Sequence, residues 1–324
     1  MEKMGRLVFA AAALLAACSV GTASAAEKVR VASSHKGVLD PTLVLLADKA
    51  GFFKDKGIEV EIFWTRGGSD TQQAVVSGSM DLGMATGLLG TLAAYEQGAP
   101  IEVISASMTG ANDIYFYVRS DSPIQAMSDA GGKTVSFSRP GASSEFVADS
   151  LVRNAGIDAK MVAAGGPSAT LTQVMSGQID VGWSAVPATL EQVDAGDVRV
   201  IATGNDVPEL RDLTVRVNIA NRDFLKEHPD TVKKFLDALQ ETIDWFYSDP
   251  NAIKVYAEAS GISESTAKQV RDKFVSKEML RLAPIGGLEQ SVKDAVASKH
   301  LSKPLTDEQM KDYAAEVAKL KPAS

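Results

Sequence analysis

The residues best suited to chemistry lie in four short loops, each placed before a predicted helix. The loops are residues 33–37, 67–69, 138–144 and 166–168. A helix N-terminus offers unpaired backbone N–H groups and a partial positive charge, while glycine lets the backbone approach a guest closely. Serine hydroxyls and cationic side chains add hydrogen-bond donors. Such loops are suited to holding a small polar or anionic molecule, and their candidate residues are Ser34, Lys36, Gly68, Arg139, Ser143 and Ser144.

Two further candidates lie on predicted strands. Trp183 comes directly after residues 180–182, where it either stacks on a ligand or packs beneath the neighbouring loop. Asn218 lies on the strand predicted at residues 213–219, and its amide is a candidate for reaching the same region.

Several loop candidates also have an ordinary structural explanation. Ser143 and Ser144 are favoured types for capping a helix N-terminus. Arg139 offers a planar guanidinium that fits an acid group, but such a side chain also forms surface salt bridges. Lys36 and its neighbour His35 are by default solvated loop residues, although both are candidates for the site.

The chain contains one pattern twice, 99 positions apart. Residues 57–83 and 156–182 align without a gap, and ten of the 27 positions are identical. Each copy predicts a strand, a glycine-containing turn, a helix and a second strand. Asp81 and Asp180 follow the glycine turns, so we expect these carboxylates to accept backbone N–H groups at the start of a strand. Two similar α/β units predict a cleft between them.

The elements around these loops alternate between strand and helix. Strands are predicted at 29–32, 58–64, 81–84, 101–107, 114–118, 133–137, 198–202 and 213–219, and helices at 40–56, 69–78, 88–97 and 142–154. Asp40-Pro41 is expected to cap and start the first helix, and Ser69 or Asp70 to cap the second. Only helices are predicted after residue 222, with an apolar stripe from Val232 to Phe246. This order predicts an α/β fold with mostly parallel sheets.

The N-terminus has the composition of a targeting segment. Lys3 and Arg6 precede an apolar run at residues 7–17, and Ala23-Ser24-Ala25 is a cleavage pattern, so residues 1–26 are predicted to be a secretory signal peptide. A competing interpretation is a lipoprotein signal at residues 15–18, in which Cys18 would carry the lipid. Either interpretation predicts an exported, periplasmic protein.

The composition argues against several classes of protein. The net charge is −8 and no run of Lys and Arg stands out, which disfavours nucleic acid as a partner. Cys18 is the only cysteine, and His35, His228 and His300 are widely spaced. No metal motif, nucleophile elbow or phosphate loop is found. We therefore expect a monomer that is not an enzyme and has no cofactor or metal.

The order of these motifs resembles bacterial solute-binding proteins, and more narrowly the nitrate, sulfonate and taurine-binding family, which includes binders of thiamine precursors. The resemblance covers residues 29 to 219, and its motifs are AxxAGFFxxxGIxV at 47–60, SGxxDxGMAT at 77–86, KxV at 133–135 with GASS at 141–144, and QxDVG at 178–182. It implies a type II fold of two lobes, joined by two crossing strands and completed by a helical tail on lobe 1. The expected boundaries are 27–112 with 214–324 for lobe 1 and 113–213 for lobe 2.

The resemblance also implies a function. A small solute would bind between closing lobes, and a membrane permease of an ABC importer would receive it. The family places the position of Thr86 on the cleft, which adds it to the candidates. A sulfonate, taurine, nitrate or small carboxylate suits the helix N-termini with Arg139 or Lys36, whereas a pyrimidine or aromatic solute suits Trp183. A ligand-sensing module for a separate receptor is a further alternative.

Overall fold

The computed structural model describes residues 26–322. The predicted signal peptide 1–26, except Ala26, and the candidate lipidation site Cys18 lie outside the described residues.

Lobe 1 is built on a five-stranded sheet with the order β2-β1-β3-β10-β4. Strand β1 pairs in parallel with β2 and β3, while β10 runs antiparallel to both β3 and β4. The four strands other than β10 therefore all point the same way. Their bounds are β1 Glu27–Ser34, β2 Ile58–Thr65, β3 Leu82–Gly87, β4 Ile101–Thr109 and β10 Thr214–Asn221.

Lobe 2 contains the remaining described strands. Three form a sheet in the order β8-β5-β9, in which β5 is antiparallel to both neighbours, and β6 pairs in parallel with β7. A parallel bridge from Val135 to Val181 links β6 to the segment that leads into β8. The bounds are β5 Ile114–Arg119, β6 Thr134–Phe137, β7 Lys160–Ala163, β8 Gly182–Ala185 and β9 Val198–Thr203.

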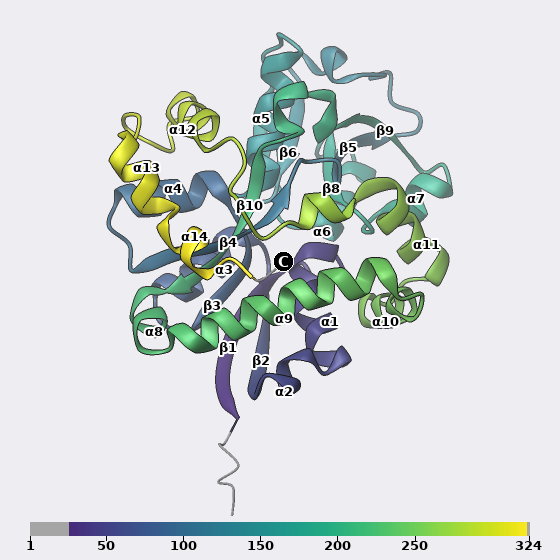
Figure 1. The fold of residues 1–324 in the computed structure, drawn as a ribbon. Helices are drawn as coiled ribbons and strands as arrows, with labels where there is room; N and C mark the ends of the chain where they lie inside the picture. The colour runs from purple at the N-terminus through teal and green to yellow at the C-terminus, as the bar shows by residue number, and fades with distance from the viewer. Residues whose placement is uncertain (1–25, 323–324) are drawn as a thin grey trace, which may run out of the picture.

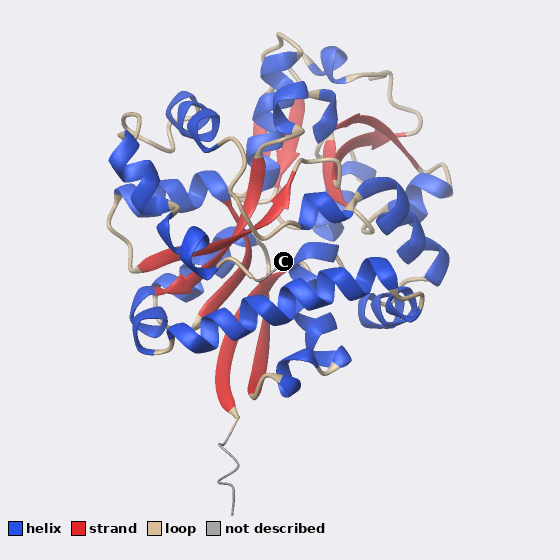
Figure 2. Cartoon of the chain, viewed as in Figure 1, coloured by secondary structure: helices blue, strands red, loops and turns tan. Residues whose placement is uncertain are grey.

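Helices surround both groups of strands (Figure 2). Lobe 1 carries α1 Leu39–Ala50, α2 Phe52–Asp55, α3 Gly68–Val76 and α4 Leu88–Glu96, and lobe 2 carries α5 Ser143–Asn154, α6 Pro167–Met175 and α7 Leu190–Asp194. Short 3-10 turns are Met127–Ala130, Gly204–Asp206, Pro208–Leu210 and Lys277–Leu280, and Val270–Phe274 is a π-helical turn.

The C-terminal segment is helical, as its apolar periodicity predicts. It contains α8 Arg222–Glu227, α9 Pro229–Ser248, α10 Asn251–Ser260, α11 Glu264–Gln269, α12 Leu288–Ala297, α13 Asp307–Tyr313 and α14 Ala315–Leu320. The apolar stripe of α9 is buried and packs on α1 and α2 of lobe 1 (Figure 1). A capping box precedes α13: the side chain of Thr306 accepts the Gln309 backbone N–H, and the side chain of Gln309 accepts that of Thr306.

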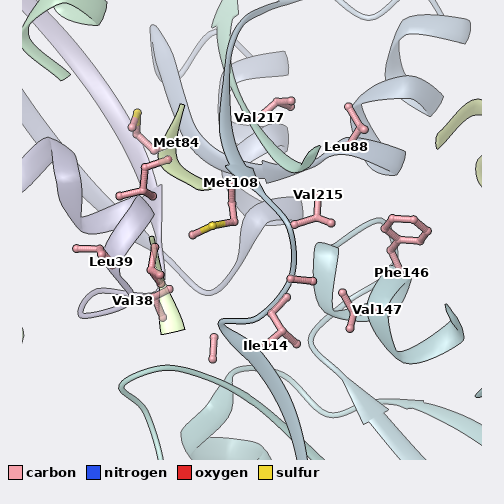
Figure 3. Close-up of a cluster of buried hydrophobic side chains, with 14 of the residues drawn as sticks. Val38, Leu39, Met84, Leu88, Met108, Ile114, Phe146, Val147, Val215 and Val217 are labelled. Atoms are coloured by element: carbon pink, nitrogen blue, oxygen red, sulfur yellow. The ribbon is translucent and has the colours of Figure 1, made fainter. Parts of the chain in front are cut away.

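The chain crosses between the lobes from β4 to β5 and again on its way into β10. Apolar side chains from both lobes meet at this junction (Figure 3). Met108 and Val217 come from lobe 1 strands, Ile114 from β5 and Val147 from α5, and all are at most 1% exposed. The two lobes therefore share one continuous hydrophobic core at the crossing.

The two sequence repeats fold alike. Residues 57–83 form β2 and α3 and lead into β3, and residues 156–182 form β7 and α6 and lead into β8. The predicted helix at 40–56 is divided into α1 and α2, because Gly51 adopts a left-handed conformation with φ 86° and caps α1.

Candidate functional site

A small cavity, which we call the inner cavity, lies where loops of both lobes meet. Lobe 1 supplies residues at the end of β1, at the start of α1 and α3 and on β3, and lobe 2 supplies the loop after β6, the start of α5 and part of β8. Its volume is about 30 Å³, which is room for about two water molecules. The lining residues are Ser34, His35, Val38, Asp40, Pro41, Gly68, Ala85, Ile114, Ser138, Ala142, Ser143, Ser144, Trp183, Ala185 and Arg216.

A buried ion cluster lies beside this inner cavity. The Arg216 guanidinium contacts Asp40 at 2.8 Å and Asp113 at 2.5 Å, and all three side chains are almost completely buried. Arg216 is on β10, Asp40 on α1 and Asp113 just before β5, so the cluster ties both crossing segments to the first helix. Ser107 also donates to Asp40 at 3.1 Å.

The cluster holds two carboxylates against one guanidinium. Burial raises the pKa of Asp113, although the attraction of Arg216 opposes that shift. For Arg216, burial lowers the pKa, but Asp113 and Asp40 outweigh burial and hold the pKa above its ordinary value. The Oδ1 atom of Asp113 is buried without a hydrogen-bond partner among the described residues. Arg216 is therefore charged at neutral pH, and its charge is already matched by the carboxylates.

His35 lies between the lobes. Its ring packs against Gly67 from the first repeat and Gly166 from the second. A Cβ added to either glycine would lie 3.4 Å from the nearest atom of the His35 ring. These two glycines are equivalent in the repeat alignment. The ring also lies 5.7 Å from the Trp183 ring, measured between centroids. Burial and the nearby Arg216 charge lower the pKa of His35 to about 4, so the imidazole is neutral at pH 7.

Two residues of the inner cavity have unusual backbone conformations. His35 has φ 40° and Ala85 has φ 56°, both in the left-handed region that residues other than glycine seldom adopt. Both line the cavity. Strained backbone of this kind is concentrated at functional sites in proteins.

The serine-rich loop of lobe 2 is held by its own hydrogen bonds. Ser144 Oγ accepts the backbone N–H of Ser138 at 3.0 Å and lies 2.8 Å from its hydroxyl. Ser143 Oγ is 3.5 Å from Arg216 Nη1. The N-cap of α5 is Ala142 and no side chain caps this helix, so the capping explanation for Ser143 and Ser144 is wrong. Both serines line the inner cavity.

A second, larger pocket adjoins the first and opens to solvent. It has a volume of about 530 Å³ and shares His35 and Val38 with the inner cavity. The cationic residues Lys36, Arg66 and Arg139 line it, together with Gly166, Pro167, Ser168 and Ala169 at the start of α6. We call this space the outer pocket.

The two lobes are in direct backbone contact where Gly87 and Gly90 of lobe 1 meet Gly141 of lobe 2, and we call this contact the rim of the cleft. A Cβ added at Gly90 would lie 2.7 Å from the Gly141 carbonyl oxygen, and one added at Gly87 would overlap the same atom. Ser69 Oγ donates to the Pro140 carbonyl at 2.7 Å across the rim. The close approach of the lobes therefore depends on glycine at these lobe 1 positions.

Seven of the nine predicted site residues line the two spaces, and Thr86 and Asn218 do not. Thr86 Oγ1 donates to the Val217 carbonyl at 3.0 Å. Asn218 accepts from the Ala85 N–H at 3.0 Å and donates to Ser105 Oγ at 2.9 Å. Both side chains are buried under the cavity wall and hold the backbone at Ala85 in place.

Of the two roles considered for Trp183, the structure shows the packing role. Its Nε1 donates to the Gly165 carbonyl at 3.0 Å, and the side chain is 2% exposed, so it is packed beneath the loop. It also contributes to the wall of the inner cavity.

The carboxylates of the repeats have the structural role expected for them. Asp81 accepts the Arg30 N–H at 2.7 Å and pairs with its guanidinium, and Asp180 accepts the Thr134 N–H at 2.9 Å. Two other expectations are wrong. Asp40 does not cap α1, whose N-cap is Val38, but pairs with Arg216; and neither Ser69 nor Asp70 caps α3, whose N-cap is Gly67.

The sequence analysis missed the ion cluster. Asp40 and Arg216 are 176 residues apart, and no local pattern links them. Arg216 gave no signal of burial, because residues 213–219 alternate apolar and polar types and Arg216 falls in the polar set with Thr214 and Asn218.

Two features are not found in the described part of the chain. Among residues 26–322, no three His, Cys, Asp or Glu side chains are grouped as metal ligands. No helix in the same range has the length and apolar character needed to cross a membrane.

A family model described as NMT1/THI5 like matches residues 40–253. This match covers more than half of the chain, which therefore belongs to the NMT1/THI5-like family. A relative is the Saccharomyces cerevisiae protein named 4-amino-5-hydroxymethyl-2-methylpyrimidine phosphate synthase THI13, with 22% identity over 221 residues. The aligned part covers 64% of this chain and 63% of that relative's length.

Solved structures show the same fold. The periplasmic aliphatic sulphonate binding protein SsuA of Escherichia coli has a TM-score of 0.68 at 18% identity, covering 88% of this chain and 91% of that one. The periplasmic nitrate-binding protein NrtA of Synechocystis PCC 6803 has a TM-score of 0.69 at 13% identity, covering 92% and 91%. The resemblance to solute-binding proteins and the two-lobe periplasmic-binding-protein fold are therefore confirmed.

Proposed function

We propose that this protein is the exported solute-binding component of an ABC importer, which captures a small solute between its lobes by hinge closure. The observation that carries the proposal is the inner cavity, whose walls come from both lobes and whose polar residues lie where strands end and helices begin. Ligands of α/β proteins collect at such positions. A space of about 30 Å³ is too small for most organic solutes, so binding requires the lobes to separate first.

Other parts of the proposal follow from this role. The lobe boundaries at 112–113 and 213–214 would act as the hinge, and a monomer would deliver its solute in the periplasm to a membrane permease. The signal peptide would direct export. Structural neighbours named as sulphonate- and nitrate-binding proteins support the role.

We also propose that the solute is bound and not converted. The named fungal relatives are synthases, so turnover is the direct alternative. Asp40 is the carboxylate that lines the inner cavity, and both it and the neighbouring Asp113 are held in ion pairs with Arg216, which leaves them poorly placed to move protons. Consumption of any bound solute over hours would contradict this part of the proposal.

The charges around the inner cavity favour one class of solute. Arg216 is already neutralised by Asp40 and Asp113, and His35 is uncharged at pH 7. A bare anion such as nitrate would meet the Asp40 carboxylate without a free cation. A solute carrying N–H donors, such as an amine or an amino heterocycle, would instead find acceptors in Ser34, Ser143 and neutral His35. We therefore favour the heterocyclic alternative over a simple anion.

A thermal-unfolding screen of the protein tests this function. The compounds are nitrate, acetate, methanesulfonate, taurine and 4-amino-5-hydroxymethyl-2-methylpyrimidine, each added up to millimolar concentration. A solute present at 100 times its dissociation constant should stabilise the folded state by about 2.7 kcal/mol. We expect the amino-bearing compounds to raise the melting temperature and nitrate to leave it unchanged. A shift with nitrate or acetate alone would contradict the proposed solute class.

Solute affinity should fall in mild acid because of His35. The pKa of His35 is about 4 in the structure described, and we expect water to reach the imidazole in an open form and return its pKa to the ordinary 6.5. Closure therefore releases a proton from His35. The full solute affinity is present above pH 6.5 and is lost as the pH falls towards 4. Between pH 7 and pH 5 we expect the dissociation constant to rise roughly 20-fold.

Calorimetric titration at several pH values measures this effect. The His35→Gln variant is the control, since its side chain is similar in length and does not titrate. Dividing the wild-type affinity by that of the variant removes any titration of the solute itself. A ratio that stays constant from pH 7 to pH 5 would show that His35 is not buried by closure.

A further inference from the structure

The outer pocket carries positive charge that the inner cavity lacks. Lys36, Arg66 and Arg139 line it, and the neighbouring carboxylate is Asp70, which contacts Arg66 at 2.8 Å and Arg139 at 3.5 Å. Two of the three cations therefore share one acidic partner. Within residues 26–322, Lys36 makes no salt bridge.

Backbone donors add to this charge. The N-cap of α6 is Gly166, and Pro167 occupies the first turn, so the first free N–H groups belong to Ser168 and Ala169, which line the pocket. The Arg139 side chain is one-third exposed, and its Nε atom, which lies 3.5 Å from Asp70 Oδ1, makes no hydrogen bond among the described residues. A planar guanidinium with free N–H groups fits the oxygens of an acid group.

The two spaces therefore differ in charge along a single path. The inner cavity is lined by Asp40 and Arg216, which share an ion cluster with Asp113, whereas the outer pocket has an excess of cations. His35 lines both spaces and lies between them. A solute long enough to pass His35 would place one end in each.

We propose that the outer pocket binds the acidic group of the same solute whose amino-bearing end occupies the inner cavity. This inference rests on the proposed function and makes the solute bipolar, with an oxyanion such as a phosphate, sulfonate or carboxylate at its outer end. The pocket opens to solvent, so the acid group keeps part of its hydration and avoids the large cost of full burial. Arg66 and Arg139 come from different lobes, so the acid group would also draw the lobes together.

Matched pairs of compounds test the inference. One pair is 4-amino-5-hydroxymethyl-2-methylpyrimidine and its phosphate ester, and the other is ethanolamine and taurine. In at least one pair we expect the member with the acid group (the acidic member) to bind ten-fold or more tightly at 50 mM salt than the member without it (the non-acidic member). Raising the salt concentration should reduce that preference, because the outer pocket is exposed.

Arginine variants separate this role from a structural one. We expect Arg139→Gln and Arg66→Gln each to reduce, at least three-fold, the ratio of the affinity for the acidic member to the affinity for the non-acidic member. Loss of the contact with Asp70 alone would weaken both members of a pair equally and leave the ratio unchanged. Arg119→Gln is the control, because this exposed arginine pairs with Asp121 and does not line the pocket, so its ratio should equal that of the wild type.

The outcomes distinguish this inference from the proposed function. If the acidic and non-acidic members bind equally, or if both arginine variants keep the preference for the acidic member, the inference is wrong and the proposed function stands. If none of the four compounds binds, the inference fails, and the proposed function is judged by the wider screen. Inorganic phosphate alone should bind weakly, and binding as tight as that of the ester would overturn the bipolar solute.

Discussion

Replacing Gly90 with alanine should prevent the lobes from closing and weaken solute binding. The added Cβ would lie 2.7 Å from the Gly141 carbonyl oxygen of lobe 2, so the rim has to separate. Overpacking of this kind costs about 1–3 kcal/mol. The dissociation constant of whichever compound binds the wild type should therefore rise by roughly 5- to 150-fold, as measured by calorimetric titration.

The stability of lobe 1 should not suffer from this change. Gly90 is inside α4, where alanine is favoured over glycine by about 1 kcal/mol. Gly131→Ala is the matched control, because a Cβ there meets no atom within 4 Å and the backbone has an ordinary φ of −55°. Wild-type affinity in Gly90→Ala would mean that the rim contact is not part of the bound form.

Replacing Arg216 with methionine should destabilise the whole protein. The change leaves Asp40 and Asp113 buried near each other without a cation. Removing one partner from a buried ion pair costs about 3–5 kcal/mol, a large fraction of a typical folding free energy. Urea unfolding at pH 7 should show a loss of that size.

The loss of folding stability in Arg216→Met should be smaller in mild acid than at pH 7. Without Arg216, burial and the charge of Asp40 hold the pKa of Asp113 in the folded protein above its value in the unfolded chain. The folded state then holds more protons, so the stability of the variant rises as the pH falls from 7 to 5, relative to wild type. Arg222→Met is the control, because it removes a partly exposed ion pair with Glu102 and should cost less than about 1 kcal/mol. Equal losses in the two variants would contradict a structural role for the cluster.

The parts of the fold that local patterns determine could be predicted from the sequence. The alternation of strands and helices, the repeat and the apolar stripe of α9 all depend on neighbouring residues, and the structure contains each of them. The roles of Asp81 and Asp180 were also predictable, because a carboxylate after a glycine turn meets N–H groups of the next strand.

The centre of the candidate site could not be predicted in this way. Asp40 has the sequence context of a helix start, and only the folded chain shows that it faces Arg216 from a strand 176 residues later. His35 resembles a solvated loop residue, yet it lies between glycines of both repeats. Such contacts depend on how the two lobes are joined, which is a long-range property. For the same reason, the sequence around Gly87 and Gly90 did not indicate that these glycines contact lobe 2.

A distance measurement across the cleft tests the central claim most directly. Spin labels at Lys49→Cys on α1 and Met175→Cys on α6, in a Cys18→Ser background, report the separation of the lobes by pulsed electron resonance. Without solute we expect a broad distribution that includes an open form. Saturation with a compound that stabilises the protein should leave one short distance, and Gly90→Ala should keep the long one. A distribution that the bound compound does not change would contradict capture by closure of the lobes.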